Sequence, residues 1–194
     1  MSRYAIVVDL DMCTGCQSCQ VACKIENDIA LGEYWNKVIE RGPFGEFPHL
    51  EKYWLPVMCQ QCEDAQCVHV CPTGASYRDP ETNVVLINKE KCIGCKYCMM
   101  ACPYGVRSWD EKENVVEKCT LCSQLTSVGK LPYCVSVCPN ECRFYGDLDD
   151  PESDASKALA KEDPANIHHL RDVGANPATA YILSEKICTW REEA

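Results

Sequence analysis

The spacing of the cysteines constrains this chain more than any other feature. The sequence has 194 residues and 18 cysteines, and sixteen of these cysteines fall into four groups. Because nearly the same spacing recurs in every group, the chain is an internal repeat whose fold must place the groups in related environments. A proline follows the last cysteine in three of the groups. The groups are Cys13-x2-Cys16-x2-Cys19-x3-Cys23, Cys59-x2-Cys62-x4-Cys67-x3-Cys71, Cys92-x2-Cys95-x2-Cys98-x3-Cys102 and Cys119-x2-Cys122-x11-Cys134-x3-Cys138.

This spacing is typical of the ligands of [4Fe–4S] clusters. In a C-x2-C-x2-C loop the backbone turns around one cube and offers it three thiolates, whereas the cysteine three residues further on ligates a second cluster. The proline then ends the short helix and turns the chain outward. The third group is the complete bacterial ferredoxin pattern. Sixteen thiolates therefore predict four [4Fe–4S] clusters.

Three other interpretations of the cysteines are weaker. Zinc sites pair two C-x2-C knuckles, which the second and fourth groups alone could supply, but zinc does not require the C-x3-C-P ending of these groups. A disulfide framework is typical of short, cysteine-rich secreted chains, but C-x2-C pairs would form strained loops. A catalytic thiol pair needs one such motif rather than four.

The fourth cysteine of each group must ligate the cluster of a partner group, so the groups work in pairs. The second and third groups are adjacent and are joined by a predicted hairpin at 75–87, which makes them one unit. The first and fourth groups then close a second unit around it, and the four clusters lie in a chain. The predicted ligand sets are Cys13, Cys16, Cys19 and Cys138; Cys119, Cys122, Cys134 and Cys23; Cys59, Cys62, Cys67 and Cys102; and Cys92, Cys95, Cys98 and Cys71.

The remaining pattern predicts an α+β fold. Short β-branched runs predict strands at 4–8, 84–87 and 115–117, a second hairpin spans 105–115, and short helices are expected at 19–25 and 98–102. We expect two interlocked ferredoxin-like units within 1–145. The outer unit comprises 1–55 with 112–145, and the inner unit comprises 56–111. Residues 146–194 are expected to dock on a partner, although the acidic stretch with which they begin could instead be an ordinary solvated surface.

Charge and hydropathy narrow the range of partners that this chain could bind. The formal charge of −10, from 29 acidic and 19 basic residues, disfavours nucleic acid, because phosphate binding requires a basic face. No apolar run approaches the ~18 residues of a membrane-spanning helix, and the start of the sequence does not have the pattern of a signal peptide. We therefore expect no membrane span and no export signal in this chain, although it could be exported while bound to a partner.

Several segments around the cysteines resemble a known family. The chain is similar to the four-cluster ferredoxin subunits of molybdopterin oxidoreductases of the dimethyl sulfoxide reductase type. Within that family it is most similar to the small subunits of polysulfide, thiosulfate and arsenate respiratory reductases. The resemblance extends over about 3–155. It rests on DLDMCTGC at 9–16, ACK at 22–24, CPTGASY at 71–77, ACPYGVR at 101–107, KCTLC at 118–122 and GDLDDP at 146–151.

The resemblance implies an electron-transfer subunit that is not an enzyme by itself. Such subunits pass electrons between a quinol-linked membrane anchor and a large catalytic subunit that holds a molybdenum or tungsten pterin cofactor. It also implies location at the extracytoplasmic face of the cytoplasmic membrane by co-export with that partner, with the cytoplasm as the alternative. The same module in a hydrogenase or formate dehydrogenase complex, or a free soluble ferredoxin, are alternative functions.

Four residues outside the predicted ligand sets have open roles. Cys142 and Cys188 stand outside all four groups, and we expect neither to be a ligand, with Cys142 packed as a buried spare thiol. Lys24 and Lys118 each lie next to a predicted ligand. A cation there would stabilise a reduced cluster and raise its potential, but either residue could equally be an ordinary surface lysine.

Overall fold

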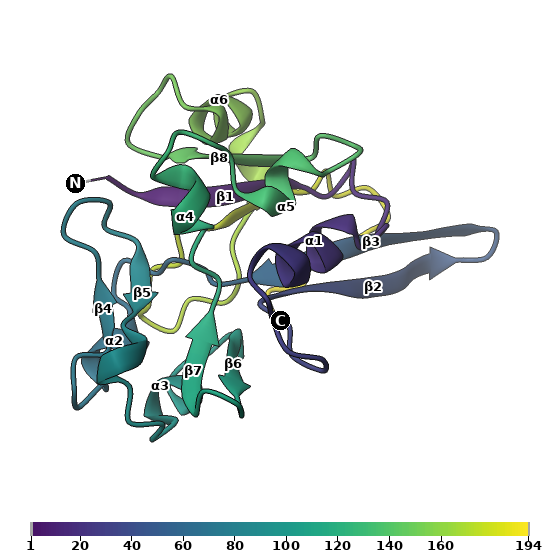
Figure 1. Ribbon diagram of the computed structural model, residues 1–194. Coiled ribbons are helices and arrows are strands. Elements are labelled where there is room, and N and C mark those ends of the chain that lie inside the picture. The colour runs from purple at the N-terminus through teal and green to yellow at the C-terminus, as the bar shows by residue number, and fades with distance from the viewer. Residues whose placement is uncertain (1, 194) are drawn as a thin grey trace.

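A four-stranded sheet joins the two ends of the chain in the computed structural model, which describes residues 2–193 (Figure 1). Strand β1 (Tyr4–Asp9) pairs antiparallel with β8 (Arg143–Asp147) and parallel with β10 (Ala180–Ile182). Strand β9 (Ile167–His168) completes the order β8-β1-β10-β9. The apolar run of β1 is fully buried because the sheet is covered on both faces.

Different elements cover the two faces of this sheet. Helix α6 (Asp154–Ala160) packs Ala155 and Ala158 against Val7 of β1. Its start is capped by Ser153, whose hydroxyl accepts a hydrogen bond from the backbone of Ser156. The opposite face packs into the main core, which also contains most of the buried cysteines.

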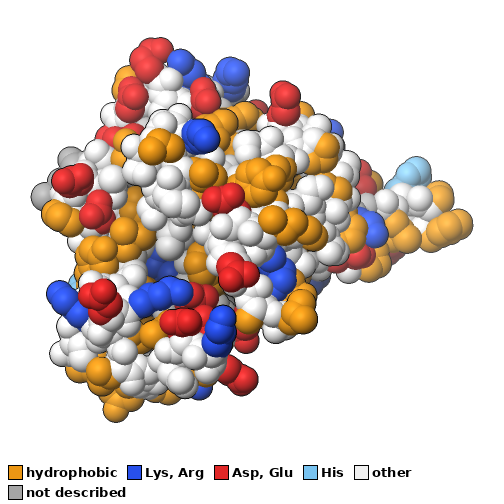
Figure 2. Space-filling model, viewed as in Figure 1, with side chains coloured by type: hydrophobic (Ala, Val, Ile, Leu, Met, Phe, Trp, Pro, Cys, Tyr) orange, Lys and Arg blue, Asp and Glu red, His pale blue; other side chains and the backbone are white. Residues whose placement is uncertain are grey.

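A long hairpin that the sequence analysis did not predict projects from the molecule (Figure 1). It consists of β2 (Asn36–Glu46) and β3 (His49–Met58), with a bulge between Arg41 and Phe44. Glycines and prolines at 42, 43, 45 and 48 interrupt the alternation that would reveal a strand. The end of β3 enters the core, whereas hydrophobic side chains gather at the outer tip (Figure 2), where Phe47 is 89% exposed.

Both predicted short hairpins are confirmed. Strands β4 (Ser76–Arg78) and β5 (Val85–Ile87) form the first, and β6 (Arg107–Asp110) and β7 (Val115–Lys118) form the second. In the second turn the carboxylate of Asp110 accepts hydrogen bonds from the backbone of two following residues, at 2.8 and 3.1 Å. These local bonds explain why the turn could be read from the sequence.

Short helices follow the cysteine loops. Each of four helices carries the third cysteine of its group: α1 (Ser18–Glu26), α2 (Gln66–His69), α3 (Tyr97–Met100) and α5 (Tyr133–Ser136). The helix predicted at 19–25 is confirmed as α1, whereas the one predicted at 98–102 is the single turn α3. Further turns are α4 (Ser123–Thr126) and the 3-10 turns η1 (Lys89–Lys91) and η2 (Pro164–Asn166).

The C-terminal segment is continuous with the rest of the fold. The boundary expected after residue 145 falls inside β8, and β10 inserts Tyr181, which is fully buried, into the main core. The structure thus has the mixed helices and strands predicted for an α+β fold. Between residues 2 and 193, no helix has both the length and the apolar character needed to cross a membrane.

Candidate iron–sulfur sites

The first cysteine group meets the end of the fourth group around one cavity. Cys13, Cys16 and Cys19 come from the loop and first turn that lead into α1, and Cys138 follows α5. The same cavity is lined by Cys142 and Arg143. The loop turns at Gly15, whose φ of +68° favours glycine.

The second and third groups exchange cysteines in the same way. Of the second group, Cys59, Cys62 and Cys67 line a cavity together with Cys102 of the third group. A separate cavity is lined by Cys71 of the second group and three cysteines of the third. The members of this separate cavity are Cys71, Cys92, Cys95 and Cys98.

The remaining four predicted ligands gather in the interior. The amide of Asn27 lies 3.8 Å from the Sγ of Cys23 and 3.9 Å from the Sγ of Cys122. Burial raises the pKa of Cys23 well above its ordinary value, and the neighbouring Cys119, Cys134 and Cys122 raise it further. The four thiols therefore lie close to one another, with Cys23 coming from a helix far away in sequence.

Burial favours neutral thiols at the interior site and at the second group's site. Burial raises the pKa of Cys62 to about 12, and burial likewise raises that of Cys119 to about 12. Iron compensates such crowded thiols, because coordination to a metal deprotonates them outright. No three His, Cys, Asp or Glu side chains within residues 2–193 converge to hold a single ion, whereas a cube presents separate iron corners to its thiolates. The donor set fits iron–sulfur cubes.

Cys142 is closer to the first site than its sequence position suggests. It is 2% exposed, and its Sγ lies 3.4 Å from the Sγ of Cys138. A hydrogen bond between the Cys142 and Cys13 thiols lowers the pKa of Cys13 and raises that of Cys142. Cys188 is buried in the main core and lines none of the three cavities described above.

Three basic side chains near the cysteines are buried, namely Lys118, Arg107 and Arg143. Lys118, which could have been a surface lysine, is buried, and its Nζ donates to the carbonyl of Cys119 at 2.7 Å. Lys24 instead donates to the carbonyls of Ala30 and Glu33. The sequence analysis did not single out the buried Arg107 and Arg143. Their position in the repeat could have revealed them in the sequence, because each is the fifth residue after the last cysteine of its group.

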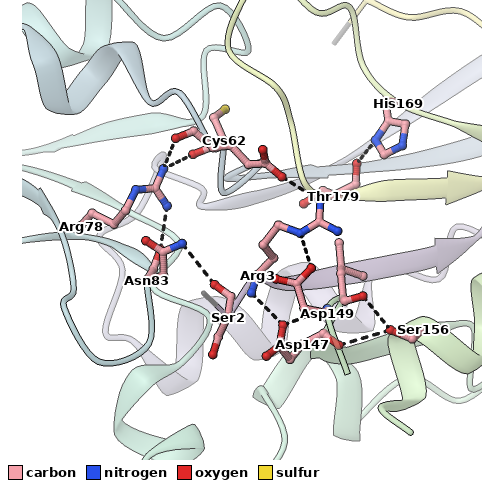
Figure 3. Close-up of polar contacts among 12 residues, drawn as sticks. Ser2, Arg3, Cys62, Arg78, Asn83, Asp147, Asp149, Ser156, His169 and Thr179 are labelled. Atoms are coloured by element: carbon pink, nitrogen blue, oxygen red, sulfur yellow. Dashed lines mark hydrogen bonds and ion pairs between the residues drawn. The ribbon is translucent and has the colours of Figure 1, made fainter. Parts of the chain in front are cut away.

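Polar contacts around the N-terminus join segments that carry different cysteine groups (Figure 3). Arg3 pairs with Glu63 and with Asp149, both at 2.7 Å. The amide of Asn83 donates to the carbonyl of Ser2 at 3.1 Å. The half-exposed ion pairs contribute little stability by themselves, so they orient these segments rather than hold them together.

The guanidinium of Arg78 fastens the β4–β5 hairpin to the second cysteine group (Figure 3). It donates to the carbonyls of Cys62, of Glu63 at 2.7 Å and of Asn83 at 2.7 Å. The bond to Cys62 attaches a backbone carbonyl within the cysteine loop directly to the hairpin. Arg78 therefore positions the loop through its backbone rather than through a thiol.

The fold and its cysteine-lined sites define a ferredoxin-type iron–sulfur protein. Family models agree: a 4Fe-4S dicluster domain matches residues 50–148, and a 4Fe-4S binding domain matches residues 10–35. The two matches together cover the segments that carry all four cysteine groups.

The similarity to curated relatives extends over nearly the whole chain. A subunit of the sulfite dehydrogenase of Allochromatium vinosum is 37% identical over 96% of this chain and 85% of the relative. The arsenate respiratory reductase iron-sulfur subunit of Shewanella sp. ANA-3 is 34% identical over 94% and 97%. The thiosulfate reductase electron transfer subunit of Salmonella typhi is 43% identical over 78% and 79%.

The chain belongs to this family of 4Fe-4S iron–sulfur subunits of reductase complexes. The predicted cofactor class and the electron-transfer, non-catalytic role are confirmed. The cysteine content and the four cysteine-lined sites fit about four [4Fe–4S] clusters.

Proposed function

We propose that this chain relays electrons through four [4Fe–4S] clusters to or from a large molybdopterin catalytic subunit. The observation that carries the proposal is that cysteines from two different groups gather at each of four places in the fold. Bound clusters would supply one-electron redox chemistry, and the chain's own part is to hold them close together. The named relatives, which are subunits of sulfite, arsenate and thiosulfate oxidoreductases, support a catalytic partner.

The order of the sites follows from thiols that influence one another across site boundaries. Burial raises the pKa of Cys134 in the interior site, and the nearby Cys19 of the first site raises it further. In the same way, burial and then Cys59 of the second group's site raise the pKa of Cys119 in the interior site. Burial and then Cys67 raise the pKa of Cys98 in the third group's site. We therefore propose a row that runs from the first site through the interior site and the second group's site to the third group's site.

The predicted ligand sets are part of the proposal. Each set takes three cysteines of one group and the last cysteine of the partner group, and this exchange interlocks an outer ferredoxin-like unit around an inner one. The proposed sets are Cys13, Cys16, Cys19 and Cys138; Cys119, Cys122, Cys134 and Cys23; Cys59, Cys62, Cys67 and Cys102; and Cys92, Cys95, Cys98 and Cys71.

Cys23→Ser tests the interlocked sets. The anaerobically purified variant should lack one of the four clusters, and the missing cluster should be the one that Cys119→Ser also removes. Cys102→Ser should instead match the loss caused by Cys59→Ser. Cys188→Ser, which removes a buried cysteine outside the sets, is the control and should retain full iron. If Cys23→Ser removes the same cluster as a serine at a residue of its own loop, the interlocked sets are wrong.

Native purification tests the partner. Anaerobic affinity purification from the source membranes should bring down a large chain containing molybdenum or tungsten, and that subunit's substrate should oxidise or reduce the clusters. The same complex should lie at the extracytoplasmic face of the cytoplasmic membrane, as co-export with the partner requires. Recovery with a nickel–iron subunit would assign the module to a hydrogenase. Recovery as a monomer would indicate a free ferredoxin.

A further inference from the structure

Two arginines occupy equivalent places in the repeat. Arg107 is five residues beyond Cys102 and begins β6, and Arg143 is five residues beyond Cys138 and begins β8. Only 6% of Arg107 and 3% of Arg143 is exposed. The repeat has thus placed a permanently charged side chain at the same point inside both cysteine-swapped pairs.

Neither arginine is neutralised by a carboxylate in the part of the chain that the structure describes. The ion pairs found among residues 2–193 involve other basic side chains. One terminal nitrogen of Arg107, and the Nε and one terminal nitrogen of Arg143, have no hydrogen-bond partner there. An uncompensated buried charge is strongly unfavourable, so the compensating negative charge must come from the cysteine sites.

Arg143 lies between the first site and the interior site. Its guanidinium lines the first cavity, while its Nη2 lies 3.8 Å from the Sγ of Cys134 and 3.1 Å from the Sδ of Met58. Burial alone would lower the pKa of Arg143, but the thiols of Cys134 and Cys19 raise it above its ordinary value. Those two thiols belong to different predicted clusters: Cys19 lines the first cavity together with Arg143, and Cys134 lies at the interior site within 3.8 Å of the guanidinium.

Arg107 repeats this arrangement in the other pair. It lines the cavity of the second group, and its Nη2 donates to the hydroxyl of Ser76 at 2.9 Å. Ser76 in turn lines the cavity of the third group, and its backbone N–H donates to the Sγ of Cys71 at 3.4 Å. Cys71 belongs to the predicted third-group cluster, and Cys67 of the predicted second-group cluster lines the same cavity as Arg107, so Arg107 also lies between two sites.

We propose that Arg107 and Arg143 are the internal cations that raise the reduction potentials of the two cluster pairs, one arginine for each pair. The proposal rests on the ligand sets of the proposed function. A cation stabilises the reduced state of a nearby cluster more than the oxidised state, because reduction adds one negative charge. No proton accompanies that electron at the arginine, since a guanidinium stays protonated in proteins. Burial makes the effect insensitive to salt.

Potentiometric titration followed by electron paramagnetic resonance tests the proposal in the intact, cluster-loaded complex. Arg143→Met removes the charge but keeps a long apolar side chain. It should lower the reduced-to-oxidised ratio of the first and interior clusters at least tenfold at a fixed potential, which is 59 mV for one electron. Arg107→Met should shift the other two clusters instead. Arg171→Met, which removes an exposed arginine, is the control for net charge.

The pattern of shifts decides the outcome. Unchanged midpoints with full iron content, or equal shifts of all four clusters in either variant, would overturn the proposal. Arg143→Lys and Arg107→Lys retain the charge and should keep midpoints near those of the parent. Arg143→Gln and Arg107→Gln also remove the charge, and they carry the test if a methionine variant fails to bind its clusters. Shifted midpoints in the lysine variants equal to those in the methionine variants would show that packing, not charge, is responsible. The serine variants assign the signals, so an error in the ligand sets appears separately as loss of the wrong cluster.

Discussion

Replacing Gly15 with alanine would force the first cysteine loop against β3. A Cβ at this position would overlap the indole ring of Trp54. Gly74, in the second cysteine group's turn, provides a matched control, because a Cβ there meets nothing within 4 Å. The two glycines have nearly the same backbone, with φ of +68° and +65°, so the two alanine variants differ mainly in the clash.

The magnitudes follow from these geometries. Alanine in the left-handed region costs roughly 1–2 kcal/mol at either position. Overpacking against the ring costs about 1–3 kcal/mol more at Gly15. Gly15→Ala should therefore lower the stability of the folded protein by about 2–5 kcal/mol, and Gly74→Ala should lower it by only about 1–2 kcal/mol.

Cluster release in guanidinium, followed anaerobically by visible absorbance, measures this difference. Loss of the clusters makes unfolding irreversible, so the comparison is between rates. If the clash is relieved in the transition state, Gly15→Ala should release its clusters about tenfold faster than Gly74→Ala for every 1.4 kcal/mol of difference. Equal rates would refute the close packing of this loop on Trp54. A restored rate in Gly15→Ala combined with Trp54→Ala would identify the ring as the cause.

Three further predictions follow from burial and metal content. Cys142→Ser should retain full iron despite its contact with Cys138, and loss of one cluster by iron analysis would make Cys142 a ligand. Tyr181→Ala should destabilise the folded protein by about 3–5 kcal/mol and so speed cluster release in guanidinium, because it leaves a cavity in the core and removes the hydroxyl that donates to Pro56 and accepts from Gln60; an unchanged release rate would contradict the core role of β10. Removal of iron by a chelator should abolish most of the circular dichroism, because cluster binding supplies folding free energy; an unchanged spectrum would show that the apo-protein folds alone.

Features encoded by neighbouring residues could be read from the sequence. The cysteine spacing is a local geometric requirement for wrapping a cube, so it predicted the cofactor class without any knowledge of the fold. The β4–β5 and β6–β7 hairpins were predicted because each has an acidic turn that ends in asparagine and is followed by a β-branched run. The predicted ligand sets also came from spacing, and they remain a prediction for the serine variants to test.

Tertiary structure decided what depends on distant segments. Strand β10 is only three residues long and pairs with β1 from the opposite end of the chain, so no local period marks it. The β2–β3 hairpin is held by its own ladder and by burial of its base, although its glycines and prolines hide the pattern. Arg107 and Arg143 look like ordinary surface arginines in the sequence, because charge is a property of the residue but burial is a property of the fold. The sequence by itself determined which residues can hold iron, and only the packed chain decided which charges lie between the sites.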